Sequence, residues 1–585
     1  MSSRPDRRVT VRPVGSPTGS RCEPATLPPA VLWGIVLLAL AVRLLYILSV
    51  RSAVFFTYLQ TEAARYHEWA TLILQSTPPT PPYDEPPGYG YFVAAVYRVF
   101  GAQVLPVALV QALLGAVSCG LIAGIAAHWF ATRAGALAGL IAALYGPLIY
   151  YTGKLEPPIV FICVVLLAMR TMLPRRPRTP RWTIVGALWA LAMVFRVEAA
   201  FALPVVALDV GRRGGREALL RVAAPLVVLV ALAVTINLRV GHQFAVFTSA
   251  PGLMLWLGND ADADGVNPFL SPSRERIAQD IGVRAPDAAA ADVMFMRRVL
   301  RFWFGQPRQA TALLWKKFLW TWNDRELSNT GDPDWETAQS WFFRRPLFPP
   351  GLGIMLPLAL AGGLLLGSGW CDVPLLAAPL AVALAAPVVF FTNGRLRLIG
   401  ATSLAILAAL ALRRLPALLR EPRAHGRLLA RAALGIAAGS YLGWSDPFGI
   451  RSYEIAELTV NRAILERAAG EVEPAVRDLR RALALNPNDT VAWLHLGLAE
   501  EQRGEDLAAL GAYLDGLARV PAERPTVAYM DALSEAPADR ALQAAAARFL
   551  RRRGSDARLL PAFVEASDEG RRALRADMLR SIARY

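Results

Sequence analysis

A carboxylate, a guanidinium group and two aromatic rings stand at helical spacing in residues 62–69. Glu62, Arg65, Tyr66 and Trp69 occupy positions i, i+3, i+4 and i+7, so a helix here places all four side chains on one face. A carboxylate can accept a proton from an attacking hydroxyl group, and an arginine fork can pair with a phosphate. An interfacial amphipathic helix with an aromatic belt explains the same pattern without chemistry. These residues alone support both interpretations equally.

Further charged residues fall where hydrophobic runs end. Asp84 and Glu85 follow the helix predicted around Glu62, and Lys154 and Glu156 stand between two later runs. The other candidates near run ends are Arg196, Glu198, Arg395 and Arg397. Several cations on one face can hold a lipid-linked phosphate by charge-assisted hydrogen bonds. Two alternatives stay open, namely ordinary headgroup contacts and an Arg196–Glu198 ion pair at a hairpin tip.

Composition defines the class of protein that must position these residues. The chain has 585 residues, of which 55% are hydrophobic and 18% charged, and the hydrophobic residues are gathered into runs. This distribution predicts an integral membrane protein with a soluble tail. The net charge of +16 comes from arginines clustered at the ends of the runs. That arrangement is the signature of cytoplasmic loops, and no nucleic-acid-binding motif accompanies it.

The hydrophobic runs predict about eleven membrane spans. They fall at 30–50, 104–127, 134–151, 157–173, 182–195, 197–209, 218–238, 352–369, 374–391, 396–412 and 428–444. Segments 182–195 and 197–209 are too short for upright spans and form either a half-buried hairpin or one long tilted helix. With the arginine clusters inside, loops 51–103 and 239–351 and the C-terminal region lie outside. We expect a bacterial inner-membrane protein with its N-terminus inside.

Three regions are expected. Residues 1–29 form a basic, disordered tail, residues 30–444 the membrane domain, and residues 445–585 a helical-repeat domain. Gly470 recurs as Gly504 and Pro487 as Pro521, each 34 residues later. This is the period of tetratricopeptide repeats, which bind peptides or partner proteins. An ordinary pair of helical hairpins is the alternative interpretation.

The sequence predicts no cofactor. The four cysteines give neither a disulfide framework nor a metal pattern. Asp260, Asp262 and Asp264 are spaced like a calcium loop, but the later bidentate glutamate is absent. A divalent metal ion therefore has no further support, and a turn-rich loop is expected there.

The region around Glu62 resembles the first external loop of GT-C glycosyltransferases, specifically the family 39-like relatives of dolichyl-phosphate-mannose protein mannosyltransferases. The matching residues are Tyr66, Trp69, Ala70, Pro87, Tyr89, Tyr91, Phe92, Tyr97, Phe100 and Gly101. Residues 140–151, 248–265 and 317–326 are similar to later segments of that family, as are Arg395 and Arg397. The resemblance extends over nearly the whole chain from residue 30.

The resemblance implies an all-α polytopic bundle of GT-C type. It further implies transfer of a sugar from a polyprenyl-phosphate donor to an acceptor hydroxyl at the external membrane face. Glu62 is then the general base, supported by Asp84 or Glu85. The donor phosphate is assigned to Arg65, Lys154, Arg196, Arg395 and Arg397, and acceptor or sugar contacts to Tyr66, Trp69 and Tyr89. The expected reaction is a direct inverting displacement.

Two departures from the family pattern support an alternative function. Glu62 stands where the family usually has aspartate, and Asn237-Leu238-Arg239 replaces an Arg-Asn pair. A longer side chain moves the carboxylate outward by about one methylene group. The alternative is therefore a non-catalytic membrane scaffold that recruits partners through its helical repeats.

Overall fold

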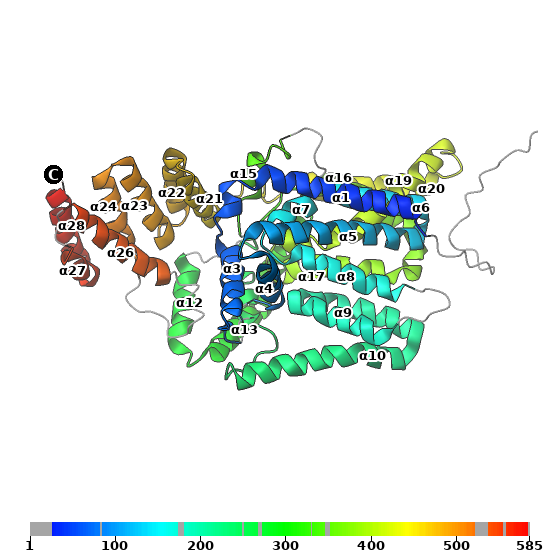
Figure 1. The fold of residues 1–585 in the computed structure, drawn as a ribbon, viewed down its shortest axis with the longest axis horizontal. Coiled ribbons are helices and arrows are strands. Elements are labelled where there is room, and N and C mark those ends of the chain that lie inside the picture. Colours follow the sequence, from blue (N-terminus) through cyan, green and yellow to red (C-terminus); the bar gives the residue numbers. More distant parts are fainter. Residues whose placement is uncertain are drawn as a thin grey trace, which may run out of the picture.

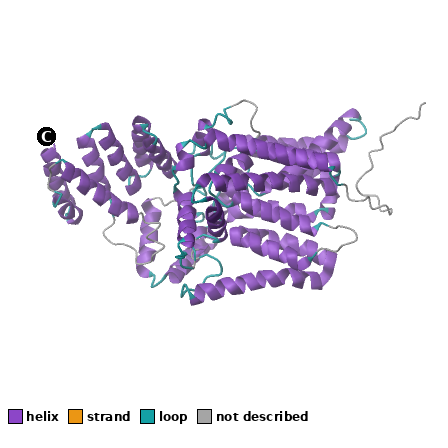
Figure 2. Cartoon of the chain, viewed as in Figure 1, coloured by secondary structure: helices purple, strands orange, loops and turns teal. Residues whose placement is uncertain are grey.

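The computed structural model describes residues 26–81, 83, 85–173, 181–248, 251–266, 272–328, 330–344, 351–520, 536–553 and 557–582. Within these residues the secondary structure is helical, and the only strand-like pairing is one bridge between Tyr83 and Thr248 (Figure 2). The predicted all-α class is therefore confirmed. A bundle of long helices lies beside a smaller group of short C-terminal helices (Figure 1).

Apolar helices, most of them long, form the membrane bundle. They are α1 (Pro29–Val50), α5 (Val104–Phe130), α6 (Thr132–Leu144), α7 (Gly146–Tyr150), α8 (Pro158–Met172), α9 (Trp182–Phe195), α10 (Leu203–Arg239), α16 (Leu352–Leu366), α17 (Ala377–Val389), α19 (Gly400–Arg420) and α20 (Gly426–Trp444). Large apolar side chains of α1, such as Trp33 and Leu37, are exposed on its outer side. An apolar exterior of this kind suits contact with lipid.

In the described part of the chain, fewer helices than the predicted eleven are long and apolar enough to span a membrane. Among the described residues, five helices are long and apolar enough to cross a bilayer, or six if α6 and α7, bent by 59°, form one span. Helices α8 and α9 and the segment Pro374–Val389 are apolar but shorter. The count of about eleven therefore stays a prediction.

The structure favours the hairpin among the two alternatives for segments 182–195 and 197–209. Helix α9 ends at Phe195, and the 3-10 turn Val197–Ala202 leads directly into α10. Gly214 of α10 lies against the indole of Trp182 at the start of α9. The two helices therefore run back along each other, with Arg196 at the tip.

The short helices between the spans gather at one end of the bundle. They are α2 (Val54–Thr57), α3 (Thr61–Leu74), α4 (Gly88–Phe100), α11 (Pro251–Leu257), α12 (Pro272–Arg284), α13 (Ala288–Gly305), α14 (Pro307–Thr321), α15 (Pro333–Gln339) and α18 (Gly394–Arg397). In Figure 1 α3, α12, α13 and α15 lie at the end that faces the C-terminal helices, and the α19–α20 connection lies at the opposite end. The two loops predicted to be external therefore share one side of the bundle.

The C-terminal helices form paired hairpins. They are α21 (Ala456–Ala468), α22 (Val472–Leu485), α23 (Thr490–Arg503), α24 (Asp506–Leu517), α26 (Ala536–Arg552), α27 (Leu559–Glu565) and α28 (Asp568–Ile582). The first residues of α21 and α23, and of α22 and α24, are 34 positions apart. Pro521 lies outside the described residues. The spacing agrees with the period in the sequence, and the tetratricopeptide assignment stays a prediction.

Candidate active site

Two charged residues from distant parts of the chain meet at the loop end of the bundle. The Arg395 guanidinium donates two hydrogen bonds to the Glu62 carboxylate. Both side chains are nearly buried, with 7% and 12% exposed. Burial by itself raises the pKa of Glu62, but the charge and hydrogen bonds of Arg395 lower it below its ordinary value. Glu62 is therefore a carboxylate held in its ionised form.

Local structure fixes both partners. Glu62 lies in the first turn of α3, and Arg395 lies in the single turn α18. The Asn393 side chain caps that turn by accepting a hydrogen bond from the Arg395 backbone N–H at 3.1 Å. The Gly394 N–H donates to the Leu327 carbonyl at 2.6 Å. The arginine is thus presented by a short, capped element and not by a mobile loop.

A second carboxylate, Glu156, lies beside this pair. Its side chain is 1% exposed, and Oε1 accepts a hydrogen bond from the Thr330 hydroxyl at 2.7 Å. Oε2 has no hydrogen-bond partner among the described residues and lies 3.8 Å from Arg395 Nη1. A buried carboxylate oxygen without a donor is rare in proteins. The sequence analysis placed Glu156 on the same side as Glu62, and the structure has it beside the Glu62–Arg395 pair, but the sequence gave it no role.

Other predicted residues surround Glu62. Arg196 donates to Glu198 at 2.7 Å, which is the ion pair considered in the sequence analysis. The positive charges of Arg196 and Arg65 also lower the pKa of Glu62, so both lie near it. Glu85 lies close enough to Arg395 for their charges to interact, whereas Asp84 lies outside the described residues.

Lys154 and Arg397 are engaged in structural contacts. The Lys154 ammonium lies 2.6 Å from Oε1 of Glu336, whose Oε2 accepts from the Tyr150 hydroxyl at 2.8 Å. Arg397 donates to the Glu326 carboxylate at 2.9 Å and to the backbone carbonyls of residues 321, 323 and 325. Sequence reasoning gave Glu336 and Glu326 no such role, because only the fold brings them to these cations. The phosphate-binding role of Lys154 and Arg397 stays a prediction.

The predicted aromatic contacts form a buried wall. Tyr66, Trp69 and Tyr89 make edge contacts with ring centroids 4.8–5.9 Å apart, and all three are at most 8% exposed. The Tyr89 hydroxyl donates to Gln111 at 2.8 Å. The Tyr66 hydroxyl has no partner among the described residues. These rings support α3, and their role in sugar contact stays a prediction.

The described residues contain no group of three or more His, Cys, Asp or Glu side chains arranged to hold a metal ion. Asp260 accepts from the Trp256 indole at 3.0 Å and from Arg298 at 3.2 Å. Asp264 accepts from the Val266 backbone N–H at 2.8 Å. Two of the three aspartates that suggested a calcium loop thus have structural partners.

Part of the chain matches a known family. Residues 84–238 match the model of the dolichyl-phosphate-mannose-protein mannosyltransferase family, and this segment includes Glu156 and Arg196. No curated protein matches the sequence significantly. Within its described residues the chain is therefore an all-helical membrane protein. Its residues 84–238 form a mannosyltransferase-family domain.

Solved structures show more distant likeness. ArnT from Cupriavidus metallidurans bound to undecaprenyl phosphate is 16% identical over 94% of this chain and 78% of that one, with a TM-score of 0.38. The Archaeoglobus fulgidus oligosaccharyltransferase in complex with Zn and sulfate is 16% identical over 71% of this chain, with a TM-score of 0.39. The present chain spans 54% of the length of that oligosaccharyltransferase.

Proposed function

We propose that the protein is a membrane glycosyltransferase that moves a sugar from a polyprenyl-phosphate donor to an acceptor hydroxyl at the external membrane face. The observation that carries the proposal is the buried Glu62–Arg395 pair at the loop end of the bundle, with Glu156 beside it. A carboxylate and cations in one buried place provide a base and a phosphate site. The mannosyltransferase-family match over residues 84–238 supports the same reaction class.

The Glu62–Arg395 pair suggests how binding of the donor phosphate makes Glu62 a stronger base. A donor phosphate that binds Arg395 competes with Glu62 for the same guanidinium group. Because Arg395 lowers the pKa of Glu62, loss of this contact makes the carboxylate more basic. Glu156 stays near enough to orient Arg395, and Arg196 adds positive charge. Substrate binding thus converts a structural ion pair into a free base and an occupied anion site.

The chemical step is one displacement. The acceptor oxygen attacks the anomeric carbon, and the bond from that carbon to the phosphate oxygen breaks. The electron pair of that bond leaves with the polyprenyl phosphate, where Arg395 stabilises the charge. The acceptor proton passes to Glu62 and then to solvent. Attack from the face opposite the phosphate inverts the anomeric configuration.

Replacement of Glu62 tests this assignment. In vesicles that contain labelled polyprenyl-phosphate mannose, Glu62→Gln should reduce transfer by about 10²–10⁴-fold, because general-base catalysis contributes that much. Glu68→Gln is the matched control, since Glu68 is an exposed carboxylate on the same helix. Undiminished transfer by Glu62→Gln would remove Glu62 from the role of base.

The alternative is a scaffold without catalysis. The observation that favours it is the double hydrogen bond from Arg395 to Glu62, an arrangement also found in purely structural ion pairs. Glu62→Asp separates the two functions. A gain of transfer indicates a degenerate site, whereas a loss indicates a site adapted to glutamate. In either case the C-terminal helices are proposed to bind a protein or peptide partner.

A further inference from the structure

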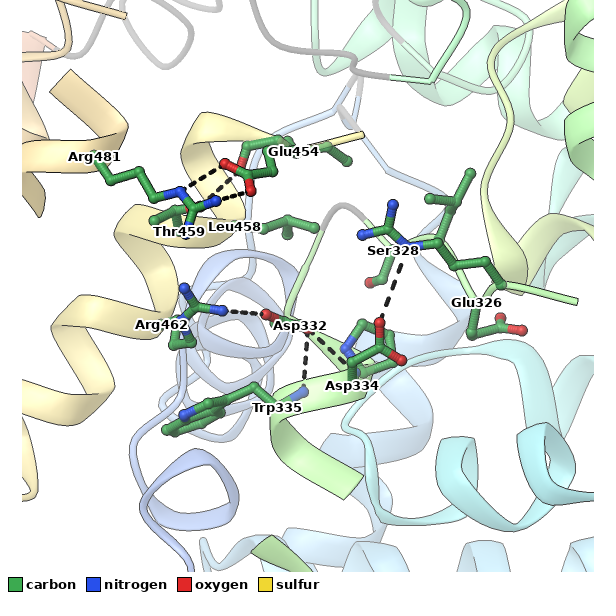
Figure 3. A pocket seen from close by; sticks show the side chains of 14 residues that line it. Glu326, Ser328, Asp332, Asp334, Trp335, Glu454, Leu458, Thr459, Arg462 and Arg481 are labelled. Carbon is green, nitrogen blue, oxygen red and sulfur yellow. Dashed lines mark hydrogen bonds and ion pairs between the residues drawn. The ribbon is translucent and has the colours of Figure 1, made fainter. Parts of the chain in front are cut away.

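A polar pocket of about 390 Å³ lies between the membrane domain and the first C-terminal hairpin (Figure 3). One wall comes from residues 325–328 and 332–335 of the membrane domain. The opposite wall consists of Glu454, Ile455, Leu458, Thr459, Arg462 and Arg481. The volume lies within the range of small-molecule sites, about 300–1,000 Å³. Neither domain alone forms this pocket.

Ion pairs fix the sides of the pocket. Arg462 Nη1 lies 2.9 Å from Asp332 Oδ2 and so joins the two walls. Arg481 pairs with Glu454 at a second side, as Figure 3 shows. Arg325 donates to the Tyr453 carbonyl at 2.8 Å and also to the Ile450 carbonyl. These contacts hold the two walls together and fix the positions of the charged groups that line the pocket.

The membrane-domain wall of the pocket adjoins the turn that presents Arg395. Leu327 lines the pocket, and its carbonyl accepts the Gly394 N–H next to Arg395. Glu326 also lines it and binds Arg397 at 2.9 Å. The residues that form the pocket are therefore bonded directly to the turn that presents Arg395.

Helix α21 of the first C-terminal hairpin also contacts the membrane domain near Glu62. The Gln60 side chain, two residues before Glu62, donates to the Asn461 carbonyl of α21 at 3.2 Å. Leu465 of α21 is buried in the main hydrophobic core of the membrane domain. Helix α21 thus packs against the segment that carries Glu62.

The chemistry of the lining identifies the kind of ligand. It holds four carboxylates and three guanidinium groups, and each guanidinium already binds a carboxylate or backbone carbonyls. The carboxylates outnumber the guanidinium groups, so the lining has no excess positive charge to attract a phosphate, and the four purely aliphatic residues are too few to bury a lipid chain. The Asp334 carboxylate stays open, with its side chain 73% exposed and Arg325 Nε 3.9 Å away. Open carboxylates accept hydrogen bonds from hydroxyl groups, and Trp335 adds an aromatic ring.

We propose that this pocket binds the acceptor, a neutral saccharide, and that the first C-terminal hairpin supplies half of the acceptor site. The proposal rests on the proposed glycosyltransferase function and names its acceptor class. The C-terminal helices then have a role in the reaction as well as in partner binding. The hydrogen bond between Leu327 and Gly394 and the ion pair between Glu326 and Arg397 connect the pocket to the turn that carries Arg395.

Photolabelling tests the binding directly in the full-length protein in lipid nanodiscs. The probes are diazirine derivatives of methyl mannoside, glucoside, galactoside and N-acetylglucosaminide, together with a diazirine-bearing peptide that contains Ser and Thr. We expect at least one glycoside to label 325–335 or 454–462. Leu458→Trp, which fills the pocket, and Asp334→Asn should each reduce labelling at least fivefold. Arg480→Gln is the control, because Arg480 pairs with Glu500 and does not line the pocket.

Transfer assays separate the outcomes. With a glycoside that labels the pocket, Leu458→Trp should raise the acceptor KM at least tenfold and leave the donor KM within twofold. Glycosides that label elsewhere or not at all, or preferential labelling by the peptide, overturn the saccharide site even if Glu62-dependent transfer occurs. Saccharide labelling without transfer from any lipid donor overturns the proposed function, and the acceptor role falls with it.

Discussion

The buried side chain of Lys317 leads us to expect that the stability of the folded protein depends measurably on pH. Its side chain is fully buried in α14, and burial lowers its pKa from 10.5 to about 7, with the charge of Arg274 adding to the effect. The Lys317 ammonium donates to Asn259 Oδ1 at 2.9 Å and to the Phe390 carbonyl at 2.8 Å. These neutral acceptors satisfy its hydrogen bonds without balancing its charge.

The sign and size of the effect follow from the two pKa values. Between pH 7 and pH 10.5 the unfolded chain keeps a proton on Lys317 that the folded protein releases. Stability therefore rises with pH across this window. At 1.36 kcal/mol per pKa unit the full penalty at low pH is about 5 kcal/mol. The gain between pH 7 and pH 9 is about 2 kcal/mol.

Thermal unfolding in detergent, followed by tryptophan fluorescence at pH 7, 8 and 9, measures this slope. The wild type should unfold at higher temperature as the pH rises, and Lys317→Met should lose most of that increase because it has no proton to release. Lys316→Met should keep most of it, since the Lys316 ammonium is only partly buried, 4.2 Å from the centroid of the Trp320 ring. Equal slopes in wild type and Lys317→Met would refute the reasoning.

Two glycine substitutions give further predictions. Gly394→Ala places a methyl group against the Glu326 carboxylate, so we expect a loss of about 1–3 kcal/mol in stability and weaker sugar transfer. Gly124 has open space around it. Gly124→Ala should therefore keep the stability and the transfer activity of the wild type in the same thermal and vesicle assays. Gly504→Ala forces a side chain into the left-handed conformation that ends α23, where φ is 79°. It should cost about 1–2 kcal/mol in thermal unfolding, and an unchanged Tm relative to Gly511→Ala would contradict this.

Local pattern was enough to predict several features. Helical spacing placed Tyr66 and Trp69 on one face of α3, and their rings are in contact. The positions of run ends placed Glu62 and Arg395 on one side of the membrane, and the structure brings them together. Span topology assigns each loop to one of the two membrane faces, so it predicts which loops share a side of the bundle.

The sequence anticipated the local Arg196–Glu198 pair, but it could not predict which charges far apart in the chain are paired. Lys154 and Glu336 are 182 positions apart, and no local pattern connects them. The same holds for Arg397, whose partners lie at the end of α14 and in the segment after it. A cation near a membrane end fits a phosphate or a buried carboxylate equally well, and only tertiary packing decides between them. The sequence likewise left undecided whether the aromatic face of α3 is exposed or buried, and the fold buries it.

The segment 388–397 is held by charges directed at backbone atoms. Lys317 binds the carbonyls of residues 388 and 390, and Arg397 binds those of residues 321, 323 and 325. The two cations therefore connect α14 and the segment around α18 in both directions. A receptor fixed in this way undergoes little reorganisation when a phosphate binds Arg395, and preorganised charge is what stabilises a leaving anion. Deprotonation of Lys317 leaves Arg397 charged, so Arg395 should keep its position when the pH rises through the pKa of Lys317.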